Sequence, residues 1–171
     1  MNDATTIAAI GQPRRMLRSS AEIPVIDVDA LLHGNVVDQR KVADQIGTAA
    51  RSVGFFYVAN HGIDEELIER AYEQAAAFFS LPLDEKLKSY IAESRNHRGY
   101  VPVTERGTYG DEGSERLYEA FDSGLELPLQ DVSVAGGCLM GPNVWPGVAG
   151  FRESATAYFR AASGFGARLC R

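Results

Sequence analysis

The sequence contains little cysteine, and the cysteine that it has follows no recognisable pattern. Cys138 and Cys170 are the two cysteines of the chain, and they lie much farther apart than the two of a C-x-x-C motif. The sequence therefore indicates neither a disulfide framework nor a zinc site, and it predicts a protein of the reducing cytoplasm. No apolar run approaches the roughly 20 residues that a membrane helix needs, so we expect no membrane span.

Basic charge is also scarce. The chain has 17 Lys and Arg residues against 23 Asp and Glu residues, a net charge of −6, which argues against a nucleic-acid-binding surface. Two motifs of common enzyme classes are missing as well. No G-x-S-x-G is present, and neither Gly136-Gly137 nor Gly164-Phe165-Gly166 lies between a strand and a helix, as a dinucleotide-binding loop requires. We therefore predict neither a serine hydrolase nor a Rossmann domain.

The strongest β-forming run lies between two glycine-containing turns. Residues 55–58 are aromatic or β-branched, and a short apolar run with turn signals on both sides is typical of a strand buried on two faces. Gly54 can adopt the left-handed conformation that ends a preceding helix. Asn60-His61-Gly62 then turns the chain into the next helix. The local prediction is helix, buried strand, turn, helix.

The segments around this run alternate between extended and helical patterns. Residues 1–21 are predicted to form a flexible arm, and residues 23–27 a second strand. The helical period that precedes the central strand begins at Asp38, a plausible N-cap. The helix that follows is capped by Asp64 and stopped by Pro82, because proline cannot continue the hydrogen-bond ladder.

The C-terminal half is predicted to contain two strands and one long helix. Residues 84–88 suggest a short and mostly solvated helical turn. Residues 99–103 and 117–122 are strand-like, and the Gly-, Asp- and Ser-rich residues 108–115 between them are typical of a loop. Pro146 is expected to open the last helix at its first turn. The apolar stripe of that helix recurs every three or four residues at Phe151, Ala155, Tyr158, Ala162, Phe165 and Leu169.

These segments, in this order, resemble the N-terminal region of the non-haem iron, 2-oxoglutarate-dependent oxygenase superfamily, in its isopenicillin N synthase-like branch. The resemblance covers residues 22–171, which correspond to about the first half of a typical member. It implies an α+β fold that is the front portion of a double-stranded β-helix, or jelly roll, with antiparallel strands and flanking helices, left incomplete. The residues that carry it are Ile23-Pro24-Val25-Ile26-Asp27, Gly54-Phe55-Phe56-Tyr57-Val58-Ala59-Asn60-His61-Gly62-Ile63, Phe78-Phe79-Ser80-Leu81-Pro82 with Lys86, Arg98-Gly99-Tyr100-Val101-Pro102, Glu119-Ala120-Phe121-Asp122 and Asn143-Val144-Trp145-Pro146.

The residues that the family's chemistry needs are missing from the sequence. Members hold Fe(II) with a His-x-Asp/Glu pair and a distant second His, and they hold 2-oxoglutarate with an Arg-x-Ser motif beyond that His. None of His33, His61 and His97 is followed two residues later by Asp or Glu. We therefore name no catalytic residue and no metal ligand. Fe(II) and 2-oxoglutarate are implied by the resemblance only, and the chain is expected to end inside its last helix, before the catalytic half.

The resemblance also implies a function and a set of site residues. A complete member would oxidise a small organic substrate with O2, and Arg98 and Tyr100 would border the mouth of its substrate pocket. The competing interpretation of Arg98 is a surface ion pair that contributes little. His61 belongs to a structural motif with Gly54, Asn60 and Gly62, in which it stabilises the turn after the strand.

Two hypotheses for the chain itself stay open at this point. It is either the N-terminal domain of such an oxygenase, inactive by itself, or a non-catalytic truncated member that binds a protein partner or has no independent function. In both cases the apolar faces that a catalytic half would cover are expected to be exposed, and self-association through them is predicted. Phe55, Tyr158 and Phe151 are among the side chains expected to lack cover.

Overall fold

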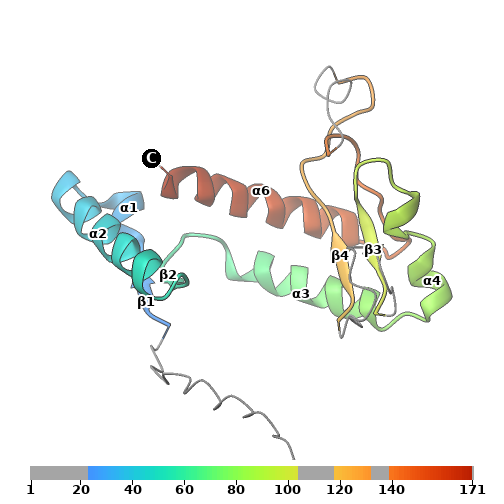
Figure 1. Ribbon diagram of the computed structural model, residues 1–171, viewed down its shortest axis with the longest axis horizontal. Helices are drawn as coiled ribbons and strands as arrows, with labels where there is room; N and C mark the ends of the chain where they lie inside the picture. Colours follow the sequence, from blue (N-terminus) through green and yellow to red (C-terminus); the bar gives the residue numbers. More distant parts are fainter. Residues whose placement is uncertain (1–22, 104–117, 132–138, 171) are drawn as a thin grey trace, which may run out of the picture.

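The computed structural model describes residues 23–103, 118–131 and 139–170 of the chain. The predicted arm of residues 1–21, the predicted loop of residues 108–115 and Cys138 lie outside them. Figure 1 shows two lobes joined by two long helices that run side by side in opposite directions, α3 (Glu65–Phe79) and α6 (Phe151–Leu169). Among the described helices, none is both long and apolar enough to cross a membrane.

The first lobe is built on a pair of short parallel strands. Strands β1 (Val25–Asp27) and β2 (Tyr57–Ala59) pair with Ile26 opposite Val58, and helices α1 (Asp29–His33) and α2 (Val36–Ser52) lie beside them. One face of the pair packs against α2. The buried residues on that side, here called the aliphatic cluster, are Ile26, Val28, Val42 and Ala49.

The opposite face of these strands is exposed, which corrects the prediction of a central strand buried on both sides. Val25 and Tyr57 are cross-strand partners on this face and are 68% and 61% exposed, and Phe55, just before β2, is 70% exposed. Parallel sheets normally have both faces covered. The apolar run forms a strand as predicted, but within the described residues only one of its faces is packed.

The N-terminal end of α2 differs from the prediction, whereas the left-handed Gly54 predicted after its C-terminal end is confirmed. Asn35, not Asp38, is the N-cap, since its side-chain oxygen accepts hydrogen bonds from the amides of Val37 and Asp38 at 2.9 and 3.1 Å. At the other end, the Gly54 amide donates to the Ala49 carbonyl, and Gly54 has φ = 86°. A residue with a Cβ is strained in that conformation.

The turn after β2 uses two more left-handed residues. Asn60 has φ = 57° and Gly62 has φ = 72°. The Asn60 amide group donates to Asp27 at the end of β1 at 2.8 Å, and the Ile63 amide donates to Nδ1 of His61 at 3.0 Å. The turn then leads into α3, which Asp64 caps as predicted by accepting a bond from the Glu66 amide.

The second lobe joins a short helix to an antiparallel strand pair. Helix α4 (Leu83–Leu87) follows Pro82, and the 3-10 turn η1 (Ile91–Glu93) leads to strand β3 (Gly99–Val101). Strand β3 pairs with β4 (Ala120–Asp122), with Tyr100 opposite Phe121. The expectation of antiparallel strands therefore holds for this pair and not for β1 and β2.

An aromatic cluster fills the space between α3, α6 and these strands. Phe78 is fully buried, and its ring lies 5.1 to 5.7 Å from those of Phe121, Tyr100 and Phe151. Phe151 is only 6% exposed, which corrects the expectation that it lacks cover. The aromatic members of the cluster are Phe78, Phe79, Tyr100, Phe121, Trp145 and Phe151.

One local prediction about this lobe is wrong, and another holds with one exception. Helix α6 begins at Phe151, after Gly150 with φ = 84°, so Pro146 lies in the approach to the helix and not in its first turn. Helix α4 is mostly exposed as predicted, with the exception of Lys86, which is 8% exposed. The burial of Lys86 was not foreseen, because local pattern does not reveal which distant segment packs against a helix.

Candidate functional site

The described residues contain no group that fits an iron ion. They include no set of three or more His, Cys, Asp or Glu side chains placed to hold a metal. His33 pairs with Asp29 on its own helix at 2.9 Å, and His61 accepts a bond from its neighbour Ile63. His97 is exposed, with φ = 53°. We therefore assign no step of iron chemistry to this part of the chain.

Arg98 binds main-chain carbonyl groups, not an acidic side chain. Its guanidinium donates to the carbonyls of Asn96 and His97 at 3.0 and 3.1 Å, and to that of Leu139 at 2.9 Å. The guanidinium lies against the backbone of Gly124, where an added Cβ would be 2.6 Å from Nη2. Within the described residues, Arg98 does not make the surface ion pair that the sequence left open. The predicted contact of Arg98 with a substrate stays a prediction.

The segment that Arg98 holds is also fastened by asparagine side chains. Asn96 donates to the Pro142 carbonyl at 3.1 Å and so links this segment to the residues before β3. Asn143 bonds both backbone groups of Gly124, accepting from its amide at 2.8 Å and donating to its carbonyl at 2.9 Å, as a strand neighbour would. Residues 139–143 are thus tied to the start of β3 and to the residues that follow β4.

Tyr100 lies beside a partly buried ion pair. Its hydroxyl donates to Oε2 of Glu119 at 2.6 Å, and the Lys86 ammonium contacts the same oxygen at 2.6 Å. Lys86 also donates to the Phe79 carbonyl at 3.2 Å and lies 5.4 Å from the centre of the Tyr100 ring. Tyr100 is 1% exposed, so a substrate cannot reach its ring without a rearrangement.

Burial and neighbouring charge perturb the pKa values of this group. Burial, together with the hydrogen bond to the Glu119 carboxylate and its negative charge, raises the pKa of Tyr100 to about 12. The hydrogen bonds from Lys86 and Tyr100 hold the pKa of Glu119 below its usual range, although its partial burial opposes this. At neutral pH the phenol is therefore protonated, and the carboxylate is ionised beside a cation.

Sequence reasoning did not single out Lys86 and Glu119 as site residues. Both lie within the motifs that carry the family resemblance, but they are 33 residues apart and each has the appearance of an ordinary solvated charge. Their positions in the sequence could have indicated a contact. Glu119 directly precedes a strand whose partner carries a buried tyrosine, and Lys86 follows the C-terminus of α3, where unpaired carbonyls attract a cation.

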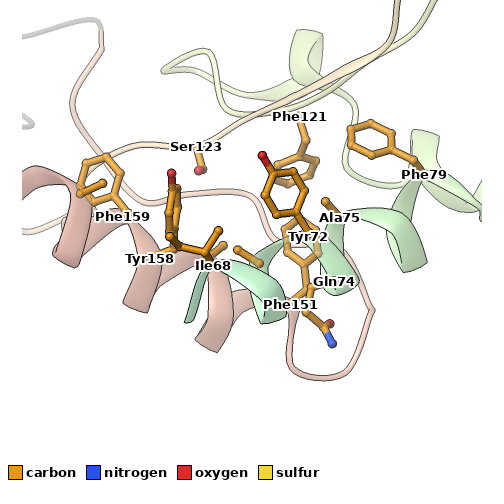
Figure 2. A pocket seen from close by; sticks show the side chains of 13 residues that line it. Ile68, Tyr72, Gln74, Ala75, Phe79, Phe121, Ser123, Phe151, Tyr158 and Phe159 are labelled. Carbon is orange, nitrogen blue, oxygen red and sulfur yellow. The ribbon is translucent and has the colours of Figure 1, made fainter. Parts of the chain in front are cut away.

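A long apolar groove runs between α3 and α6. It has a volume of about 520 Å³ and a floor containing small side chains, among them Ala71, Ala75 and Ala155. Aromatic side chains rise beside them, including Tyr72, which is 75% exposed, and Tyr158. Figure 2 shows the hydroxyl groups of both tyrosines on the side of Ser123, whereas Gln74 points the other way. The groove has the character of a packing surface, since its lining is aliphatic and aromatic apart from Gln74 and Ser123.

Comparison with known proteins identifies the family. Residues 23–147 match the family described as "non-haem dioxygenase in morphine synthesis N-terminal". The chain is 36% identical over 132 residues to homoarginine-6-hydroxylase 2-ODD-C23.2 of Arabidopsis thaliana, a match that covers 73% of this chain and 36% of that protein. It is 34% identical over 155 residues to the 2-oxoglutarate-dependent dioxygenase citB of Monascus ruber, covering 84% of this chain and 45% of that protein.

The fold agrees with that of a solved oxygenase. The structure resembles a 2OG-Fe(II) oxygenase family protein from Caulobacter crescentus, with a TM-score of 0.69 at 23% sequence identity, over 87% of this chain and 46% of that one. The described helices and small sheets therefore have the arrangement of the front portion of a jelly-roll 2-oxoglutarate oxygenase. The chain spans less than half the length of the relatives that it matches. It belongs to the family of non-haem dioxygenase N-terminal regions.

Proposed function

We propose that this chain is the N-terminal part of an Fe(II)- and 2-oxoglutarate-dependent oxygenase that oxidises a small organic substrate with O2. The family match over residues 23–147 is the observation that supports this most strongly. The relatives above are named as a hydroxylase and a 2-oxoglutarate-dependent dioxygenase, and both are more than twice as long as the matched region. The iron ligands and the 2-oxoglutarate-binding residues would be supplied from outside this sequence.

We propose further that Arg98 and Tyr100 border the substrate pocket of the complete enzyme. The geometry supports an indirect contribution, because Arg98 holds Leu139 and the start of β3 in place, and Tyr100 is anchored by Glu119. Such fixed side chains suit a pocket wall, since a site must be held rigidly to select its substrate. The two distant cysteines support a cytoplasmic location, and the net charge of −6 supports the absence of a nucleic-acid partner.

The groove between α3 and α6 is proposed to pack against the jelly-roll half of the complete protein. Two helices with a shared apolar face need a second layer, and an antiparallel sheet with one apolar face is the usual partner. The length of the relatives beyond the matched region supports this occupant. When the chain is alone, a second copy is proposed to take its place, and the chain then self-associates.

The test compares two polypeptides, the 171-residue chain and the product of the complete coding region. We expect the 171-residue chain neither to bind Fe(II) tightly nor to release succinate from 2-oxoglutarate, because it lacks a His-x-Asp/Glu pair. The complete product is expected to do both. Anaerobic Fe(II) titration and a succinate assay measure these two properties. An inactive complete product would favour the non-catalytic alternative, and turnover by the short chain would contradict the assignment of the iron site.

A further inference from the structure

Four segments of the second lobe meet at one ammonium–carboxylate contact. The C-terminus of α3 contributes the Phe79 carbonyl, α4 contributes Lys86, β3 contributes Tyr100, and the residue before β4 is Glu119. The side chains of Lys86 and Glu119 are 10% and 26% exposed. A charge that is largely withdrawn from water is tolerated only when its partners are placed accurately. The contact therefore demands a particular arrangement of all four segments.

The same region is held by a second, backbone connection. The Tyr100 amide donates to the Ser89 carbonyl at 2.7 Å, and the Ser89 hydroxyl donates to the Lys86 carbonyl at 3.0 Å. Gly99 has φ = 122°, and an added Cβ there would overlap the Ser89 carbonyl oxygen. The first residues of β3 therefore pack closely against the residues that follow α4. This packing restricts movement of Tyr100 relative to Lys86.

The consequence extends to Arg98, two residues before Tyr100. Its guanidinium reaches Leu139 and lies against Gly124, and its Nε has no hydrogen-bond partner within the described residues although it is buried. A buried N–H without a partner is unfavourable, so this position must be imposed by the packing around it. The Arg98 amide donates to Oγ of Ser94 at 3.1 Å, and Tyr100, two residues further along the chain, is anchored by Glu119.

We propose that Lys86 and Glu119 are positioning residues: through Tyr100 they hold β3 in the place that lets Arg98 fasten residues 139–143. The positioning role rests on the proposed function in one respect only, namely that residues 139–143 and the start of β3 form a wall of the substrate pocket. The coupling itself concerns contacts within the chain and needs no substrate, iron or 2-oxoglutarate. Neither Lys86 nor Glu119 is assigned a contact with the substrate.

The test is hydrogen–deuterium exchange on the 171-residue chain at low micromolar concentration. The variants are Lys86→Met, Glu119→Gln and Tyr100→Phe, of which the last keeps the ring and the ion pair and removes one hydroxyl. In each, amide exchange in residues 94–101 and 139–143 is expected to rise about tenfold, while α2 changes by less than about twofold. The matched control is Glu85→Gln with Lys88→Met, which removes an exposed pair of the same 2.6 Å length in and just after α4. It should leave all of these segments unchanged.

A spectroscopic measurement separates positioning from simple loss of stability. Glu119→Gln is expected to lower the pKa of the Tyr100 phenol, because it removes a negative charge and an acceptor. Lys86→Met is expected not to lower it, because the carboxylate then acts on the phenol without its neutralising cation. The absorbance of tyrosinate during alkaline titration reports both, with Tyr100→Phe identifying the signal.

Three results would overturn the inference. Faster exchange confined to residues 94–101, with residues 139–143 unaffected, would limit the ion pair to a local role. Equal acceleration throughout the chain would show general destabilisation, and an equal fall of the phenol pKa in Lys86→Met and Glu119→Gln would show the same. All three are independent of the succinate assay, so this inference and the proposed function can fail separately.

Discussion

The two lobes are stabilised by different kinds of contact. The aliphatic cluster of the first lobe contains four buried residues, all of which lie within the first 49 residues of the chain. The aromatic cluster of the second lobe joins residues from Phe78 to Phe151 and has a partly buried ion pair at its edge. The buried residues of the first lobe therefore lie close together in sequence, although Phe165 of α6 also packs against them, and the second lobe depends on segments brought together from distant parts of the chain.

The difference indicates which lobe contributes more to the free energy of unfolding. A fully buried aromatic side chain contributes more apolar area than a valine or an alanine, and edge-to-face ring pairs add a further increment. Phe78 contacts four other rings at once. The second lobe should accordingly be the more stable, and the first lobe, with Val25, Phe55 and Tyr57 exposed, should depend on cover from elsewhere.

The largest expected effect comes from removing the central ring. Phe78→Ala should destabilise the chain by about 3–5 kcal/mol, because it leaves a large cavity among four aromatic rings. Val42→Ala in the aliphatic cluster removes only two methyl groups and should cost about 1.5–2 kcal/mol. Urea denaturation followed by fluorescence of Trp145 measures both. Equal costs would remove the distinction between the two clusters.

The second expected effect is a pH dependence that arises at the edge of the aromatic cluster. The raised pKa of Tyr100, about 12, favours the folded state below its ordinary value of 10, and this contribution is lost as the pH rises through 10 to 12. A shift of this size corresponds to about 3 kcal/mol. The lowered pKa of Glu119 acts at the other end, with a contribution that is lost as the pH falls below the ordinary value of 4.5.

Urea midpoints measured across the pH range test this pH dependence of stability. One variant tests the alkaline loss and another tests the acid loss. Tyr100→Phe should remove the alkaline loss that belongs to the phenol, and Glu119→Gln should weaken the acid loss. A wild-type alkaline slope that survives in Tyr100→Phe would assign the effect to other groups.

A smaller effect is expected at the glycine that ends α2. Gly54→Val should cost about 1–3 kcal/mol, because valine is strained at φ = 86° even though open space surrounds the position. The matched control is Gly164→Ala in the middle of α6, also in open space, which should instead stabilise the chain by about 0.5–1 kcal/mol. His61→Ala should cost less than Gly54→Val, since it loses one hydrogen bond and a ring contact with Phe165. Thermal midpoints rank the three variants.

The last expected effect is on association and not on stability. Tyr72→Lys and Tyr158→Lys place charges in the groove between α3 and α6 and should reduce self-association of the isolated chain. Leu129→Lys, at a position that is 70% exposed and outside the groove, is the control and should have little effect. Light scattering after size-exclusion chromatography gives the mass of each variant. If Leu129→Lys were equally effective, general solubility and not the groove would explain the result.

Much of the local structure was predictable from pattern. The helical stripes, the Asp64 cap and the strands around residues 25–27, 57–59, 99–101 and 120–122 follow from side-chain periodicity and turn chemistry, which act between residues close in sequence. The family resemblance followed from motifs in order along the chain. The missing iron ligands could also be found by inspection, because a His-x-Asp/Glu motif is local.

The contacts between distant segments could not be predicted in this way. Whether β2 has one covered face or two, whether Lys86 is solvated or buried, and whether Arg98 binds an acid or a carbonyl all depend on which remote segment lies alongside. Glu119 lies 33 residues from Lys86, and Leu139 lies 41 residues from Arg98. The sequence by itself determined the elements and the family. Only the tertiary structure decided which charges meet and which apolar faces stay open, because those depend on packing among all the elements together.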